Sequence, residues 1–207
     1  MQRTFYFDLA SPLAYLAAEQ VLGLLEGPCE WQPVLARELP AGAARARAGG
    51  DAPDALRTAG CDRPDALRAE AERGARALGL QPLRWPDPFP FDSALAMRVA
   101  TFAHSIGRAV PFAQAAFRQA FAGGHSLQDP DFVLIAAAAC EMHPDAVTSA
   151  AAQRSVAERL AATTAAAAAA GVRDVPAVVI ADDGAGAGGR VFAGERELEQ
   201  AGRVLRE

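Results

Sequence analysis

The stretch FDLASPLAYL near the N-terminus places the hydroxyl of Ser11 directly before a proline and a helical pattern. Ser is a preferred N-cap and Pro12 suits the first helical position, so the pair can be a cap with no further role. A helix N-terminus also presents unpaired N–H groups and a partial positive charge, which favour an anion. The residues alone leave both roles open, and the two roles are compatible.

The elements expected around Ser11 are a strand, a helix and a second strand. Thr4–Phe7 is short, β-branched and aromatic, which predicts a buried strand. A helix is predicted from Pro12 to the Gly-Pro pair at 27–28, and Glu30–Leu35 is predicted as a strand with Pro33 at an edge or at the strand's end. This order predicts a parallel βαβ unit with a right-handed crossover.

The rest of the chain predicts a long helical block followed by two further strands. Between about 38 and 170 the sequence shows no strand pattern. Helices are expected at 65–78, 93–106, 111–121, 131–141 and 145–170. Strands return at Val175–Ala181 and Arg190–Ala193, and a closing helix begins at Glu195. The Gly-rich loop 182–189 joins two strands, so we interpret it as a hairpin tip and not as a phosphate cradle. The fold class is therefore α/β with an all-helical insertion.

Composition narrows the function classes. The 207 residues carry a formal net charge of −5, which argues against nucleic acid or an anionic membrane as the main partner. No uninterrupted apolar stretch reaches the length of a membrane helix, and Asp8 interrupts any signal-peptide core. The three cysteines, Cys29, Cys61 and Cys140, form no C-x-x-C pair, so a reduced cytoplasmic protein is expected.

Five segments, in order, resemble the 2-hydroxychromene-2-carboxylate isomerases and the kappa-class glutathione transferases, a DsbA-like group with a thioredoxin fold. They are FYFDLASPLAYLAAEQ, PVLARELPAG, PFPFDSALAMRVATFA, GVRDVPAVVI and FAGERELEQ. The resemblance implies a thioredoxin-like domain formed by residues 1–37 and 165–207, and a helical insertion at 38–164. Ser11 and Ala14 stand where a DsbA-like protein has its two cysteines, which excludes redox chemistry at this position.

The resemblance also implies a set of site residues. Ser11 would hold the thiolate of glutathione, or of another low-molecular-weight thiol, at the helix N-terminus, where the pKa of a thiol is lowered. Val175 and Pro176 would offer backbone to a peptide-like ligand, with a cis peptide bond between them. Gly194 and Glu195 stand where the family holds the γ-glutamyl ammonium with a small polar residue and an Asp. Both are departures that put the identity of the thiol in question.

Two further residues are candidates for contact with the substrate, although each also has an ordinary structural explanation. Asp92 stands where the family has Asn; it is equally suited to cap a helix, and at the site it would repel an acidic aromatic substrate. Trp85 could line an aromatic pocket or belong to the core. The three histidines, at 104, 125 and 143, show no spacing that would bind a metal.

We therefore expect a glutathione-dependent isomerase or transferase that acts on a small conjugated or aromatic substrate. The alternative is a non-redox thioredoxin-fold protein that binds a peptide or a small acid without glutathione chemistry. No nucleic-acid or membrane partner is expected. A homodimer is compatible with the resemblance, but the sequence carries no specific interface signal.

Overall fold

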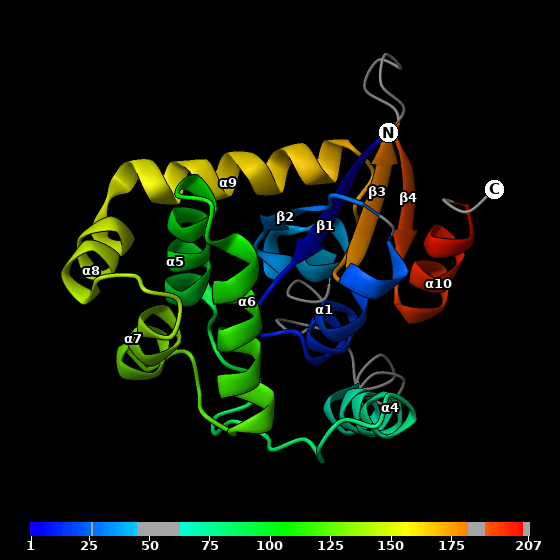
Figure 1. Ribbon diagram of the computed structural model, residues 1–207, viewed down its shortest axis with the longest axis horizontal. Coiled ribbons are helices and arrows are strands. Elements are labelled where there is room, and N and C mark those ends of the chain that lie inside the picture. The colour runs from blue at the N-terminus through cyan, green and yellow to red at the C-terminus, as the bar shows by residue number, and fades with distance from the viewer. Residues whose placement is uncertain (26, 45–62, 182–188, 205–207) are drawn as a thin grey trace.

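The computed structural model describes residues 1–25, 27–44, 63–181 and 189–204. A four-stranded sheet in the order β2-β1-β3-β4 forms its centre (Figure 1). The strands are β1 (Gln2–Phe7), β2 (Glu30–Pro33), β3 (Ala177–Ala181) and β4 (Arg190–Ala193). β1 pairs parallel with β2 and antiparallel with β3, and β3 pairs antiparallel with β4. The predicted βαβ unit and the two C-terminal strands are confirmed, and Pro33 ends an edge strand as expected.

The two faces of the sheet belong to different layers because side chains alternate along each strand. On one face, Phe5 and Phe7 pack against Trp31, with ring centroids 4.9 and 5.9 Å apart. This face joins the core that includes α1 (Pro12–Leu24) and α10 (Glu195–Val204). On the other face, Tyr6 packs with a smaller apolar cluster that includes residues of α9 (Arg154–Ala169).

The regular elements of the insertion, in its described residues, are all helices. Its elements are η1 (Ala36–Glu38), α4 (Arg63–Ala77), α5 (Ala94–Ser105), α6 (Ala109–Phe117), the π-helical turn η2 (Arg118–Ala122), α7 (Pro130–Ala138) and α8 (Pro144–Ala152), followed by α9. Helices α5 to α8 gather on the β2 side of the sheet, whereas α4 lies apart from them, beside α1 (Figure 1). The insertion therefore contacts the α/β core both at β2 and at α1, which packs against α4, α6 and η2.

The expectation of one helix over residues 145–170 is wrong. The chain forms α8 and α9, separated at Gln153, whose backbone is extended with φ −72° and ψ 132°. The Ala-rich run carries no Gly or Pro at this point, so no residue type there indicates a break. The change of direction lets α8 contact α5 and α7 while α9 runs across the sheet.

Two other expectations concern boundaries. The predicted hairpin is confirmed by the antiparallel β3–β4 pair, although its tip, 182–188, lies outside the described residues. The expected domain boundary at residue 165 lies within α9, which continues across it. None of the described helices has the length and apolar character needed to cross a lipid bilayer.

Candidate functional site

The topology brings three of the predicted segments to one edge of the sheet. β1 runs toward Ser11, and β3 begins at the same edge because it is antiparallel to β1, with Tyr6 opposite Ala177. β4 is antiparallel to β3 and therefore ends there too, with Ala193 opposite Ala177. The Gly194 amide donates a hydrogen bond to the Pro176 carbonyl at 3.1 Å. The N-termini of α1 and α10 thus lie at the same edge of the sheet.

Ser11 is the N-cap of α1, as the sequence predicts. Its Oγ accepts a hydrogen bond from the Ala14 amide at 3.2 Å, and Pro12 occupies the first turn. The side chain is half-buried, so it is reachable from solvent. The hydroxyl proton is not used by this cap, because the oxygen is the acceptor in that bond. It remains able to donate to an anion placed at the helix N-terminus.

Asp8 stabilises the loop that carries Ser11 through hydrogen bonds of its buried carboxyl. The carboxyl is 3% exposed and accepts hydrogen bonds from the amides of Ala10, at 2.9 Å, and Ala36, at 2.8 Å. The Ser93 hydroxyl donates a third hydrogen bond. Burial raises the pKa of Asp8, while these donors and the charge of Arg37 act to lower it. The Asp8 carboxyl therefore connects the β1–α1 loop, the segment after β2 and the N-cap residue of α5.

Val175 and Pro176 are joined by a cis peptide bond, as the family resemblance implied. They lie immediately before β3, at the edge of the sheet that carries Ser11. The Val175 amide donates to the Asp174 carboxylate at 3.0 Å, so a ligand that uses this N–H must compete with a local partner. The backbone expected to receive a peptide-like ligand is in place, with its amide already bonded.

The turn between β4 and α10 has a structural reason for its glycine. Gly194 has φ +85°, a region that side chains rarely adopt, while a Cβ placed there would meet nothing within 4 Å. Glu195 is the first residue of α10. Glu197, the third residue of α10, accepts a hydrogen bond from the Ala193 amide at 2.7 Å. The absence of a side chain at 194 is thus explained by backbone conformation and not by a need for space.

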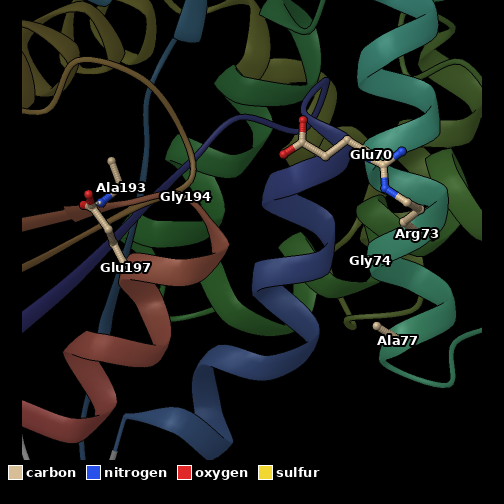
Figure 2. A pocket seen from close by; sticks show the side chains of 7 residues that line it. All are labelled: Glu70, Arg73, Gly74, Ala77, Ala193, Gly194 and Glu197. Carbon is tan, nitrogen blue, oxygen red and sulfur yellow. Dashed lines mark hydrogen bonds between the residues drawn. The ribbon is translucent and has the colours of Figure 1, made fainter.

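An open cavity of about 610 Å³ lies between this turn and the insertion (Figure 2). Ala193, Gly194 and Glu197 line one side, and α4 lines the other with Glu70, Arg73, Gly74 and Ala77. Helix α1 packs against both α4 and α10, so the cavity opens between its two neighbours. Two carboxylates and one guanidinium therefore face a space next to one of the five predicted cofactor residues. Ser11, Val175 and Pro176 do not line it.

Asp92 lies at the surface close to Asp8. Its carboxylate accepts from the Ala94 amide at 2.9 Å, so it caps the start of α5, and it pairs with Arg37 at 2.6 Å. Both side chains are 53% exposed. Because Ala36 and Ser93, the neighbours of this pair in the chain, both bond Asp8, the pair lies over the buried carboxyl. Its negative charge is partly offset by Arg37, which weakens the expected repulsion of acidic substrates.

Trp85 is half-buried and belongs to an aromatic cluster. Its ring packs against Phe89 and Phe121, with centroids 4.9 and 6.2 Å apart, and its Nε1 donates to Glu72 at 3.0 Å. The Arg68 guanidinium lies over the ring, 5.3 Å from its centroid. Phe121 also stacks on Tyr15, one turn into α1. The cluster is thus connected to the first turns of α1 and packs as part of the core, as the structural explanation predicts.

The cysteines and the potential metal ligands are the remaining reactive groups considered from the sequence. Cys29 and Cys140 are free, and burial raises the pKa of both thiols, that of Cys29 to about 11. Cys61 lies outside the described residues. Within the described ranges, no group of three potential ligands could hold a metal ion.

Sequence reasoning missed the residues that support the site from elsewhere in the chain. Asp8 was not among the predicted site residues, although an acid at the end of a buried strand and just before a helix was a usable signal. Glu70, Arg73 and Glu197 gave no signal, because charged residues on helices are usually solvated. Their shared position depends on how α4 and α10 pack on α1.

A sequence profile of the DsbA-like thioredoxin domain matches residues 4–205. The chain belongs to this family. The 2-hydroxychromene-2-carboxylate isomerase structure is similar to it, with a TM-score of 0.77 and 18% sequence identity, over 100% of this chain and 97% of that one. The cytosolic disulfide reductase DsbM of Pseudomonas aeruginosa is also similar, with a TM-score of 0.66 and 12% identity, over 100% and 96% of the chains. These identities support a shared fold. None of the curated proteins matches the sequence.

Proposed function

We propose that this DsbA-like protein is a glutathione-dependent isomerase or transferase whose thiol is held at Ser11. The observation that carries the proposal is a hydroxyl N-cap in the place where redox relatives have a cysteine. Ser11 lies at the sheet edge where β1, β3 and β4 present their ends. With Ser11 and Ala14 at the two positions, the chain cannot form a disulfide there. A sulfur that reacts at this helix N-terminus must come from a ligand.

The chemistry that suits this arrangement begins with an external thiolate. The N-terminus of α1 favours the anion, and the Ser11 hydroxyl can donate a hydrogen bond to it. In the isomerase reaction, the sulfur would add to a conjugated double bond, rotation would follow about the bond that has become single, and elimination would return the thiol. No net oxidation or reduction occurs. The protein would contribute a lowered thiol pKa and the orientation of both reactants.

The cavity at the β4–α10 turn supports a charged, peptide-like thiol. Its size is in the range of small-molecule sites, and it carries Glu70, Arg73 and Glu197. Carboxylates suit an ammonium group, and a guanidinium suits a carboxylate. Glutathione carries both kinds of charge, so a molecule that extends from Ser11 past Gly194 would meet complementary groups.

Titration with reduced glutathione, followed both by calorimetry and by the absorbance of the thiolate, tests the proposal. We expect glutathione to bind to the wild-type protein and to show thiolate absorbance there. We expect weaker thiolate absorbance when the Ser11→Ala variant is titrated in the same way. Losing one hydrogen bond to a charged group should raise the pKa of the bound thiol by about 1–2 units. Ser105→Ala is the matched control, because that exposed serine bonds the Phe102 carbonyl at the far end of α5. An unchanged thiol pKa in Ser11→Ala would contradict the mechanism.

The second candidate is a binding protein for a peptide or a small acid, without thiol chemistry. The observations that favour it are the missing side chain at Gly194 and the Asp174 carboxylate that already occupies the Val175 amide. The same titration separates the two. If millimolar glutathione does not bind while a peptide or a small acid does, the binding protein is the better description.

A further inference from the structure

Asp8 is the only buried acidic side chain among those that the structure describes, and the reaction proposed above gives it no role. It follows the last residue of β1 and precedes Ser11 by three positions. Removing a carboxylate from water is unfavourable unless its oxygens receive hydrogen bonds. The contacts of this carboxyl therefore decide how far its ionised form is stabilised against the cost of burial.

Those contacts favour the ionised form, whereas burial acts more strongly in the opposite direction and raises the pKa of Asp8. The amides of Ala10 and Ala36 can only donate, and the Ser93 hydroxyl donates as well. Among the described residues, the charge of Arg37 acts to lower the pKa of this carboxyl, and Arg37 is half-exposed and already paired with Asp92. Three donors satisfy the buried carboxylate while its charge is only partly offset from outside.

The carboxylate lies directly behind the backbone that forms the thiol seat, by which we mean Ser11 and the first-turn amides of α1. One carboxylate oxygen accepts from Ala10, the residue before Ser11. The Asp8 carbonyl accepts from the Ser11 amide itself at 3.0 Å. Phe7 and Leu9, on either side of Asp8, have no exposed surface, so little water separates the two positions. A charge at Asp8 is therefore weakly screened from the seat.

We infer that the negative charge of the buried Asp8 carboxylate opposes a thiolate at Ser11, and so limits the thiolate stabilisation that the N-terminus of α1 provides. The inference rests on the proposed function only in taking Ser11 as the place where sulfur is held. The nucleophilicity of thiols explains why a limit on thiolate stabilisation would favour addition and elimination. Nucleophilicity falls as the pKa falls, and the best attacking thiol has a pKa near the ambient pH. Without the charge of Asp8, the N-terminus of α1 would lower the thiol pKa further, and the thiolate would be a weaker nucleophile.

A thiol built into the seat tests this without glutathione. In Ser11→Cys the introduced thiol reports the local field, and its pKa follows from the pH dependence of alkylation by iodoacetamide, read peptide by peptide by mass spectrometry. We expect Asp8→Asn, added to Ser11→Cys, to lower that pKa. A unit charge within about 10 Å, at an effective dielectric of about 20, changes the ratio of thiolate to thiol roughly tenfold. The shift should persist in about 1 M salt, because Asp8 is buried.

The sign separates charge from mere support of the loop. If Asp8 only held the loop, its loss would loosen the seat and leave the pKa unchanged or higher, and either result would overturn the inference. Asp129→Asn, the same change at the exposed cap of α7, is the control and should leave the pKa unchanged. If Asp8→Asn does not fold, Asp8→Ser decides the question. It also removes the charge while it keeps one acceptor oxygen, so it should shift the pKa in the same direction, and no shift would overturn the inference.

This outcome is separable from the fate of the proposed function. Failure of the wild-type protein to bind glutathione would remove the cofactor, yet the introduced thiol would still report the field of Asp8. Conversely, an unchanged pKa in the reporter would remove the role of Asp8 while glutathione binding stands.

Discussion

Helices α1 and α7 begin with the same local chemistry but lie in different surroundings. Each starts with a proline that follows a side-chain cap. Ser11 accepts from the Ala14 amide at 3.2 Å, and Asp129 accepts from the Asp131 amide at 2.9 Å. Ser11 is half-buried at the edge where three strands end, whereas Asp129 is exposed in the insertion (Figure 1). A cap motif therefore stabilises a helix wherever it occurs, and tertiary position decides whether it can also hold a ligand.

The largest expected difference concerns what lies behind each cap. Asp8→Ala should lower the free energy of unfolding by about 2–5 kcal/mol, because the buried amides of Ala10 and Ala36 both lose their acceptor. Urea unfolding measures this. A loss below about 1 kcal/mol would mean that water replaces the carboxylate as the acceptor. The loop before α1 would then gain no more stability from Asp8 than α7 gains from its cap.

The next effect separates the two caps by function. Ser11→Ala should lower the ratio of thiolate to thiol in bound glutathione by tenfold or more. Asp129→Ala should leave this ratio unchanged, since α7 is remote from the sheet edge. Spectrophotometric titration of the bound thiol gives both values. Equal effects from the two substitutions would mean that the thiol is held elsewhere.

A smaller effect should be common to both helices. Each of the substitutions Ser11→Ala and Asp129→Ala should cost about 1 kcal/mol of stability, which is the usual value of an N-cap. Thermal or urea unfolding of the two variants side by side provides the measurement. A cost at Ser11 far above that at Asp129 would indicate that the serine supports tertiary packing in addition to the helix.

The smallest effect is a pH dependence that only the α1 side should show. Burial raises the pKa of Asp8 above its ordinary value of 3.8, so the folded state holds the proton more tightly than the unfolded state. The stability contributed by Asp8 is then fully present below about pH 4 and is lost as the pH rises through the folded value. The stability difference between wild type and Asp8→Asn should therefore shrink as the pH rises. Urea unfolding at several pH values tests this, and a difference that grows with pH would show that hydrogen bonds and Arg37 outweigh burial.

Local patterns were sufficient for the framework of the fold. The βαβ unit followed from TFYF, from Pro12 and from the second strand, and β4 was predicted with its exact limits. Ser11 was identified as a cap because capping depends on neighbours in sequence. The split between α8 and α9 was missed, since nothing local at Gln153 distinguishes it from the surrounding helix formers.

The parts of the site that sequence reasoning missed depend on packing between distant segments. Asp8 meets Ala36 and Ser93, which are 28 and 85 positions away in the chain, so no spacing rule connects them. The cavity needs α4 and α10 to lie on either side of α1. Gly194 was interpreted as an altered ligand contact, whereas its φ of +85° shows that the turn itself requires glycine.

The strand order has a consequence for how this chain is made. β1 is an inner strand, and one of its two partners is β3, whose residues 177–181 lie near the other end of the chain. During synthesis, β1 and β2 leave the ribosome early, but one edge of β1 stays unpaired until the entire insertion has emerged. An open strand edge next to Phe5 and Phe7 is a template for unwanted pairing. The time between the emergence of β1 and the emergence of β3, and not the stability of the folded sheet, should therefore determine how far this protein depends on chaperones.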